Sequence, residues 1–214
     1  MRILAVPVKS LSRSKTRLSK VLSPLERGAL TLAMLEDVLD AASQMPGWET
    51  WVISPDEAVL EIAVRRRVRG VREDRSPLSA AVRQVEREAK AAEAQSLAVL
   101  LGDVAMITPE ALAAALQTIG PVVVAPDSSG KGTNMLLRRP PRSIQAHFGP
   151  HSMSRHADAA AERELPISTV VLPELAFDLD TAADIEFLLK SGREGRTRAC
   201  LLEMGAGTRL SPVS

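Results

Sequence analysis

Apolar positions follow two different periods along the chain, and these alternate from the first residues to about residue 190. Short apolar runs typical of strands occur at 3–8, 49–54, 68–71, 96–101, 121–125 and 169–172. Stripes with the spacing of amphipathic helices lie at 22–45, 56–66, 77–94, 109–118, 154–164 and 181–190. This alternation predicts a three-layer α/β/α fold around a mainly parallel, twisted sheet.

The segment 126–134 (PDSSGKGTN) interrupts this alternation. The apolar stretch 135–137 is expected to return from this turn as an antiparallel strand. Gly130 and Gly132, with Lys131 between them, would let an anion approach the backbone closely. The alternative is an ordinary hairpin turn.

Helix starts are marked by residues that cap the first turn. Ser23 precedes Pro24, and Thr108 precedes Pro109. A hydroxyl can accept a hydrogen bond from a free N–H group of the first turn, and proline fits the first helical position. We therefore expect helices to begin at Pro24 and at Pro109.

Composition excludes several classes of protein. The chain has 214 residues and a net charge of +1, whereas a broad nucleic-acid surface needs a marked basic excess. Aromatic residues make up 2% with no tyrosine, which removes a stacking platform for single strands. A single cysteine, Cys200, cannot form an internal disulfide. With no apolar stretch long enough for a signal peptide or a membrane span, we expect a cytoplasmic protein with no membrane or nucleic-acid partner.

Four cations gather directly after the first predicted strand. They lie within the segment KSLSRSKTR and are Lys9, Arg13, Lys15 and Arg17. Ligands of open α/β sheets bind beyond the carboxyl ends of the strands, so this basic loop suits a polyphosphate. The alternative is a solvated basic loop without a ligand.

Acidic residues follow the predicted central strand and a later extended segment. Asp103 comes just after the apolar run 96–101 and Gly102, where a carboxylate is costly to bury without a partner. Asp178 and Asp180 are two residues apart and share a face if extended. Together the three could bind Mg²⁺, a hard cation that prefers carboxylate oxygens. Alternatively, Asp103 and Asp180 only precede helix starts.

A third polar stretch, 147–154 (HFGPHSMS), precedes the helix predicted from Ser154. The free N–H groups of a helix start, with Ser152 and Ser154 nearby, could hold a phosphate or carboxylate. The chain's three histidines, at 147, 151 and 156, do not have the spacing of a zinc pair on one helix.

Five separated motifs, in order, resemble a known family. They are VPVKSLSRSKTRLS (6–19), LGDVAMIT (101–108), GKGTN (130–134), FGPHS (148–152) and FDLDTAADIEFLL (177–189). The chain resembles the 2-phospholactate and phosphoenolpyruvate guanylyltransferases of coenzyme F-420 biosynthesis, which are glycosyltransferase-A-like nucleotidyltransferases related to molybdenum cofactor guanylyltransferase. The resemblance implies a nucleotidyltransferase domain at 1–191, followed by a C-terminal tail at 192–214.

The resemblance also implies a reaction and the residues that perform it. GTP and a phosphorylated three-carbon acid would give a guanosine diphosphate-linked product and pyrophosphate with the help of Mg²⁺, and phosphoenolpyruvate is expected ahead of 2-phospho-L-lactate. The implied nucleotide-binding residues are Pro7, Lys9, Lys15, Arg17, Leu78, Ser79 and Gly102. The implied acceptor-binding residues are Thr133, Gly149 and Ser152, and the implied metal ligands are Asp103, Asp178 and Asp180. Lys15 and Asp103 would be catalytic. The partners would be a second copy of the chain, in a homodimer, or a downstream transferase.

The chain departs from the family pattern at several positions. Ser79 stands where the family usually has asparagine, and Val104 and Ala105 follow Asp103 in place of Leu-Pro. Lys131 stands where a small or hydroxylated residue is common. Two other hypotheses therefore stay open: a related nucleotidyltransferase with another nucleotide or acceptor, such as 3-phosphoglycerate, and a nucleotide-binding subunit without turnover.

Overall fold

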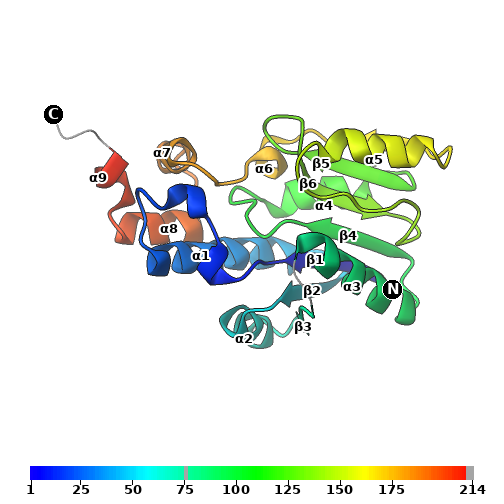
Figure 1. Cartoon of the computed structure of the whole chain (residues 1–214), viewed down its shortest axis with the longest axis horizontal. Helices are drawn as coiled ribbons and strands as arrows, with labels where there is room; N and C mark the ends of the chain where they lie inside the picture. The colour runs from blue at the N-terminus through cyan, green and yellow to red at the C-terminus, as the bar shows by residue number, and fades with distance from the viewer. Residues whose placement is uncertain (75–76, 211–214) are drawn as a thin grey trace.

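The protein is built around one seven-stranded sheet with the strand order β3-β2-β1-β4-β6-β5-β7 (Figure 1). The computed structural model describes residues 1–74 and 77–210. The strands are β1 (Arg2–Pro7), β2 (Glu49–Ser54), β3 (Arg69–Arg72), β4 (Ser96–Leu100), β5 (Val122–Pro126), β6 (Thr133–Arg138) and β7 (Ile167–Thr169). Only β6 pairs antiparallel, with β4 and β5, among the pairings of the described strands. The predicted fold class and its antiparallel element are confirmed.

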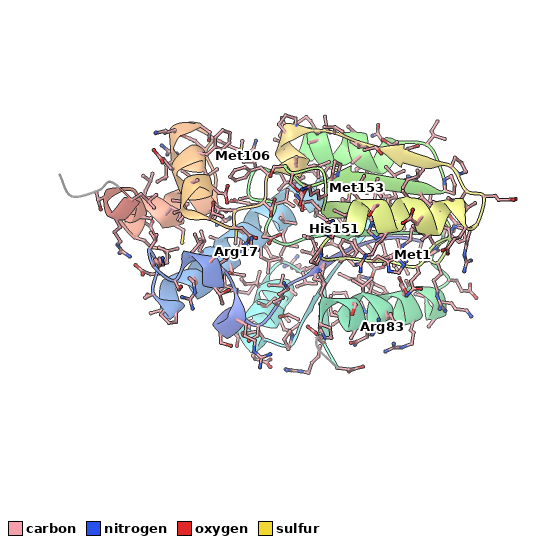
Figure 2. The ribbon with its side chains drawn as sticks, turned by 45° about the horizontal axis from the view of Figure 1, so that its top comes forward. Met1, Arg17, Arg83, Met106, His151 and Met153 are labelled. Carbon is pink, nitrogen blue, oxygen red and sulfur yellow. The ribbon has the colours of Figure 1, made fainter. Side chains whose placement is uncertain are left out.

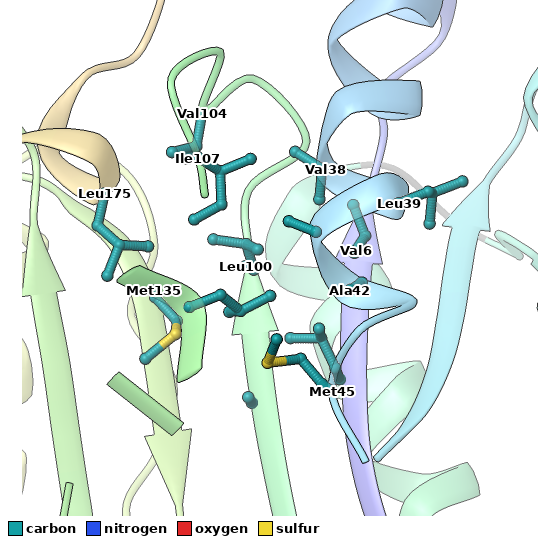
Figure 3. Packing of buried hydrophobic residues seen from close by; sticks show 14 of the residues in the cluster. Val6, Val38, Leu39, Ala42, Met45, Leu100, Val104, Ile107, Met135 and Leu175 are labelled. Carbon is teal, nitrogen blue, oxygen red and sulfur yellow. The ribbon is translucent and has the colours of Figure 1, made fainter. Parts of the chain in front are cut away.

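Helices cover both faces of the sheet, since alternate residues of each strand point to opposite faces. Leu4 and Val6 of β1 face a layer formed by α1 (Pro24–Ala42), α2 (Glu57–Arg65), α4 (Pro109–Gln117) and α6 (Pro173–Ala176). Figure 3 shows this side of the core, with Val6, Leu100 and Met135 beneath residues of α1 and the 104–107 loop. The opposite face packs against α3 (Leu78–Ala91) and α5 (Ser152–Ala161). Of the helices described, none is long and apolar enough to cross a membrane.

The predicted caps are present at both helix starts. The Ser23 hydroxyl accepts from the Glu26 N–H, and the Glu26 carboxylate accepts in return from the Ser23 N–H, which completes a capping box. The Thr108 hydroxyl accepts from the Ala111 N–H at 3.0 Å. Both helices begin at the predicted proline, so local sequence alone defines these boundaries.

Two predicted boundaries are wrong. Helix α5 begins at Ser152, two residues before the predicted Ser154. The strand expected at 169–172 lies at Ile167–Thr169. It ends earlier because the short helix α6 begins at Pro173 and Leu172 is the N-cap of that helix. The segment 73–79 (EDRSPLS) has the composition of a polar turn, and this predicted turn lies partly outside the described residues.

The last helices of the chain add a separate apolar cluster beside the sheet. Helices α7 (Ala182–Lys190), α8 (Arg196–Glu203) and α9 (Ala206–Leu210) pack there against α1 and the loop after β1. Asp37 of α1 accepts hydrogen bonds from the N–H groups of Arg196 (2.8 Å) and Thr197 (2.9 Å), so a carboxylate of α1 caps α8. The described part of the segment predicted as a tail, 192–214, thus contains the two helices α8 and α9.

Candidate active site

The carboxyl ends of β1 and β4 lie side by side because these strands pair in parallel. The basic loop, with short helices at Leu11–Arg13 and Thr16–Leu18, follows β1, and Asp103 follows β4. A cleft of about 290 Å³ opens between them. Figure 2 shows Arg17 of this loop and His151, at the start of α5, both near the middle of the molecule. The sheet edge predicted to bind ligands is therefore hollowed.

Most of the predicted nucleotide-binding residues line this cleft. They are Pro7, Lys9, Lys15, Arg17, Leu78 and Gly102, joined by Asp103 and Asp180. A side chain at Gly102 would place its Cβ 3.0 Å from Val8 Cγ2, so glycine lets the two strand ends approach closely. Ser79, in the first turn of α3, is absent from this lining. A second hollow of about 360 Å³, lined in part by Glu73 and Ala81, shares Pro7, Lys9 and Leu78 with the first.

Backbone and amide contacts bring the acidic segment 177–180 to Asp103. The Leu179 N–H donates to the Asp103 carbonyl oxygen at 3.3 Å. Asn134 Nδ2, on β6, donates to the carbonyl oxygens of Leu175 (3.0 Å) and Ala176 (3.1 Å) just before this segment. The acids therefore meet through contacts between residues far apart in sequence.

Lys15 lies between two of these acids. Its Nζ atom is 2.8 Å from Asp103 Oδ2 and 2.8 Å from Asp180 Oδ1, and its side chain is only 5% exposed. Arg17 Nη1 approaches Asp180 Oδ2 at 3.6 Å. The Lys15 backbone has φ 47° and ψ 42°, a left-handed conformation that costs a residue with a Cβ about 1 kcal/mol or more. With the backbone in this conformation, the ammonium group of Lys15 lies against Asp103 and Asp180.

The charges of this cluster shift its pKa values in opposite directions. Burial alone would lower the pKa of Lys15, but Asp103 and Asp180 outweigh it and raise this pKa. Burial would raise the pKa of Asp180, yet Lys15 and Arg17 hold it below its ordinary value. Burial and the negative charges of Asp103 and Asp180 raise the pKa of Asp178 to about 6. Asp178 is therefore the carboxylate that Lys15 compensates least.

The predicted metal ligands are neighbours, with Lys15 between two of them. Within residues 1–74 and 77–210, no group of three histidine, cysteine or acidic side chains is arranged to hold a metal ion. Asp103 Oδ1, however, is buried and has no hydrogen-bond partner. An unpartnered buried carboxylate oxygen beside two further carboxylates has the donor chemistry that Mg²⁺ prefers. The residues thus fit Mg²⁺ chemically, and its binding by Asp103, Asp178 and Asp180 stays a prediction.

Arg27 of α1 holds the basic loop through hydrogen bonds, a role that the sequence did not reveal. Its side chain is buried, and it donates to the carbonyl oxygens of Ser14 (3.3 Å) and Leu22 (3.4 Å). Leu18, between these two positions, is fully buried. The loop is thus anchored on both sides of Lys15 and Arg17. An arginine within the first helical turns has no local pattern that would indicate this contact.

The predicted acceptor-binding residues lie at the same edge of the sheet, outside the lining of the cleft. The Leu101 N–H donates to the Asn134 carbonyl oxygen at 2.9 Å, which places Thr133 beside the end of β4. Ser152 opens α5, and its hydroxyl is buried without a hydrogen-bond partner. Gly149, three residues earlier, has φ +111° and open space where a Cβ would lie. Met153 N–H donates to the Lys131 carbonyl oxygen at 3.1 Å, which ties α5 to β6.

The glycine turn before β6 is filled by a side chain of the chain itself. Asp127 Oδ1 accepts from Ser129 Oγ (2.7 Å) and from the Lys131 N–H (3.2 Å). A Cβ at Gly132 would lie 2.2 Å from Asp127 Oδ2. The turn is thus a hairpin closed by the Asp127 carboxylate, and the anion expected near Gly130 and Gly132 stays a prediction.

Comparisons with known proteins agree with this geometry. The chain is 39% identical over 190 residues to the phosphoenolpyruvate guanylyltransferase of Rubrobacter xylanophilus, covering 87% of this chain and 93% of that protein. It is 30% identical over 188 residues to the 3-phospho-D-glycerate guanylyltransferase of Colwellia psychrerythraea, covering 86% and 90%.

A solved structure from Desulfovibrio desulfuricans, assigned to the nucleotide-diphospho-sugar transferases, matches with a TM-score of 0.79 at 16% identity and covers 96% of each chain. This likeness concerns the fold. A family model described as guanylyl transferase CofC like matches residues 1–212. The chain therefore belongs to the CofC-like guanylyl transferase family of nucleotidyltransferases.

Proposed function

We propose that this guanylyltransferase joins GTP to phosphoenolpyruvate, releases pyrophosphate and acts in the biosynthesis of coenzyme F-420. The observation that carries the proposal is the cleft in which Lys15 meets Asp103 and Asp180. Similarity to the guanylyltransferase of Rubrobacter xylanophilus supports the choice of acceptor. Work in the cytoplasm, a homodimer and transfer of the product to a downstream enzyme stay predictions.

The cationic wall of the cleft suits the triphosphate of GTP. Lys9, Arg13, Lys15 and Arg17 line it within one loop. Ammonium and guanidinium groups bind non-bridging phosphate oxygens and neutralise the charge that develops on the departing pyrophosphate. Leu78, shared by both hollows, offers an apolar contact for the nucleoside. Lys15 would thus serve binding and catalysis together.

Asp103, Asp178 and Asp180 are the residues that would hold Mg²⁺. When bound, the ion supplies positive charge and Lewis acidity beside the phosphates. In the structure Lys15 offsets part of the charge of Asp103 and Asp180. Once the ion compensated these acids, the ammonium group of Lys15 could turn to phosphate oxygens. Asp178, with its raised pKa, gains most from added positive charge.

The acceptor would bind across the sheet edge at Thr133, Gly149 and Ser152. The N–H groups of Ser152 and Met153, expected to be free, already donate to the carbonyl oxygens of Gly149 and Lys131. The buried, unpartnered hydroxyl of Ser152 and the positive end of the α5 dipole suit the phosphate or carboxylate of the acceptor. An acceptor phosphate oxygen attacks the α-phosphorus of GTP, a new P–O bond forms, and the bond to pyrophosphate breaks. The acceptor phosphate is already an anion near neutral pH, so positioning and charge neutralisation suffice and a general base is unnecessary.

Pyrophosphate release tests the proposal directly. GTP, ATP, CTP and UTP are each combined, with Mg²⁺, with phosphoenolpyruvate, 2-phospho-L-lactate and 3-phosphoglycerate. We expect turnover with GTP and phosphoenolpyruvate. Turnover with GTP and 3-phosphoglycerate alone would indicate that this chain has the activity for which its Colwellia relative is named. GTP binding without release of pyrophosphate would indicate a non-catalytic subunit.

A further inference from the structure

His156 is a buried histidine in direct contact with Thr133. It lies on α5, one turn beyond Ser152, and its side chain is 0% exposed. Its Nδ1 atom is 3.1 Å from Thr133 Oγ1, and its Nε2 atom is 2.8 Å from the backbone nitrogen of His147. The Phe148 ring contacts it edge-on, with the ring centroids 5.6 Å apart. Both ring nitrogens thus have a defined partner.

The partner of Nε2 determines where the ring carries its proton. A backbone N–H group can only donate, so the N–H of His147 requires Nε2 of His156 to accept. The ring is therefore neutral with its proton on Nδ1, since an imidazolium would set two donors against each other. Burial, followed by the positive charge of Arg138, lowers the pKa of His156 to about 3, in agreement with a neutral ring.

This tautomer determines what the Thr133 hydroxyl offers to a ligand. Nδ1–H of His156 donates to Thr133 Oγ1, which occupies a lone pair of the hydroxyl. The hydroxyl has one proton of its own, and this proton has to point elsewhere. Among the described residues, His156 Nδ1 is the one hydrogen-bond partner of this hydroxyl, so its proton is available to an anion that reaches Thr133. A hydroxyl that donated to histidine would instead present only lone pairs and repel an anion.

We propose that His156 is a positioning residue that holds the Thr133 hydroxyl as a hydrogen-bond donor toward an anionic group of the acceptor. The proposal rests on the assignment of Thr133 to the acceptor under the proposed function. The position of the Ser152 hydroxyl supports this proposal. Ser152 lies four residues before His156, hence on the same face of α5, and its buried Oγ atom has no hydrogen-bond partner among the described residues. The hydroxyl held by His156 and the unpartnered hydroxyl of Ser152 would then bind one anion.

A double-mutant cycle between Thr133 and His156 tests the proposal. Thr133→Val keeps the shape of the side chain and removes the hydroxyl. His156→Gln keeps an acceptor near the position of Nε2 but removes the donor at Nδ1. Each single variant is expected to raise the acceptor KM about tenfold, the effect of one hydrogen bond to a charged group, and to leave the GTP KM within about twofold. The double variant is expected to raise it no further, because both changes remove one interaction.

The outcomes separate this inference from the proposed function. An acceptor KM unchanged in Thr133→Val would refute the assignment of Thr133 to the acceptor. A second contrary result is that Thr133→Val raises the acceptor KM as expected while His156→Gln leaves it unchanged, and a third is that the two increases in KM multiply in the double variant. Either of these would show that the positioning role is wrong and that His156 only packs α5 against the sheet. Thr50→Val, a buried threonine on β2 far from this edge, is the matched control and should change neither KM.

Nitrogen NMR of the wild-type chain gives a second test if His156→Gln does not fold. One of the three histidines should carry its proton on Nδ1 and should not titrate between about pH 5 and 8. Its signal should shift in Thr133→Val. A proton on Nε2, or protonation of this ring within that range, would overturn the proposal.

Discussion

Replacing Asp178 by asparagine should make the folded protein more stable at neutral pH and inactivate it at the same time. Asp178 is largely buried beside Asp103 and Asp180, whose negative charges oppose its ionisation. Lys15 hydrogen-bonds to those two acids, and its charge offsets only a small part of the opposition to the ionisation of Asp178. Asparagine has nearly the same shape and no charge, so it removes the repulsion without opening a cavity.

The pKa of Asp178 determines the size and the sign of this effect. The folded protein raises that pKa from 3.8 to about 6, and each unit is worth about 1.4 kcal/mol, so ionisation costs the folded state at most about 3 kcal/mol. Because the folded pKa is raised for an acid, the cost is absent below pH 3.8 and complete above pH 6. Partial exposure reduces it, and we expect a gain of about 2 kcal/mol at pH 7.5 and about half of this at pH 5.

Urea unfolding of wild type and Asp178→Asn, at both pH values and in buffer with a chelator, measures this difference. Asp158→Asn, at an exposed position of α5, is the matched control and should change stability by less than about 0.5 kcal/mol. Addition of Mg²⁺ should then stabilise wild type more than Asp178→Asn, because a ligand that binds only the folded state shifts the unfolding equilibrium.

Two results would refute this reasoning. Asp178→Asn could be less stable than wild type at pH 7.5, which would mean that the carboxylate makes favourable contacts that outweigh the repulsion. Alternatively, the gain could be equal at pH 5 and 7.5, and the stabilisation would then not arise from the charge of Asp178. Full activity of the variant would in addition remove Asp178 from the metal ligands.

Three further substitutions test other parts of the site. Asp103→Asn should reduce kcat at least 100-fold while the fold is retained, because it removes charge and not volume; an unchanged kcat in pyrophosphate release would contradict a role at the reacting phosphates. Lys15→Met should raise the GTP KM and destabilise the fold by about 2–3 kcal/mol in thermal unfolding, since Asp103 and Asp180 lose their buried partner; equal stability would mean that solvent replaces it. Gly132→Ala should cost about 2 kcal/mol, because the new Cβ would lie 2.2 Å from Asp127 Oδ2, and Asp127→Ala in the same chain should recover most of it.

The periodicity of the sequence was sufficient to predict the sheet, its antiparallel strand and the caps at Ser23 and Thr108. These features depend on local pattern and on the chemistry of single turns. The basic loop and Asp103 were predicted to lie near each other because ligands of open α/β sheets bind beyond the carboxyl ends of the parallel strands. The ion pairs of Lys15 did not follow, because they join residues 88 and 165 positions apart.

Other features of the site depend on local contacts that no period reveals. The Gly130–Gly132 turn resembles an anion-binding loop by composition, but whether Asp127 or a ligand fills it depends on a side-chain rotamer. His156 was considered only as a zinc ligand and set aside. Its spacing of four residues from Ser152 was the available signal, since it places both side chains on one face of α5.

The cluster that joins α7, α8 and α9 to the basic loop has a consequence for the order in which the chain is made. Leu18 and Leu22 are synthesised early, yet they are buried together with Leu179, Leu188 and Leu201. During translation the first strand and its loop leave the ribosome long before these partners do. The basic loop after β1 can therefore reach its final form only when nearly the whole polypeptide has been released, so we expect a nascent chain to lack the nucleotide affinity proposed for the finished protein.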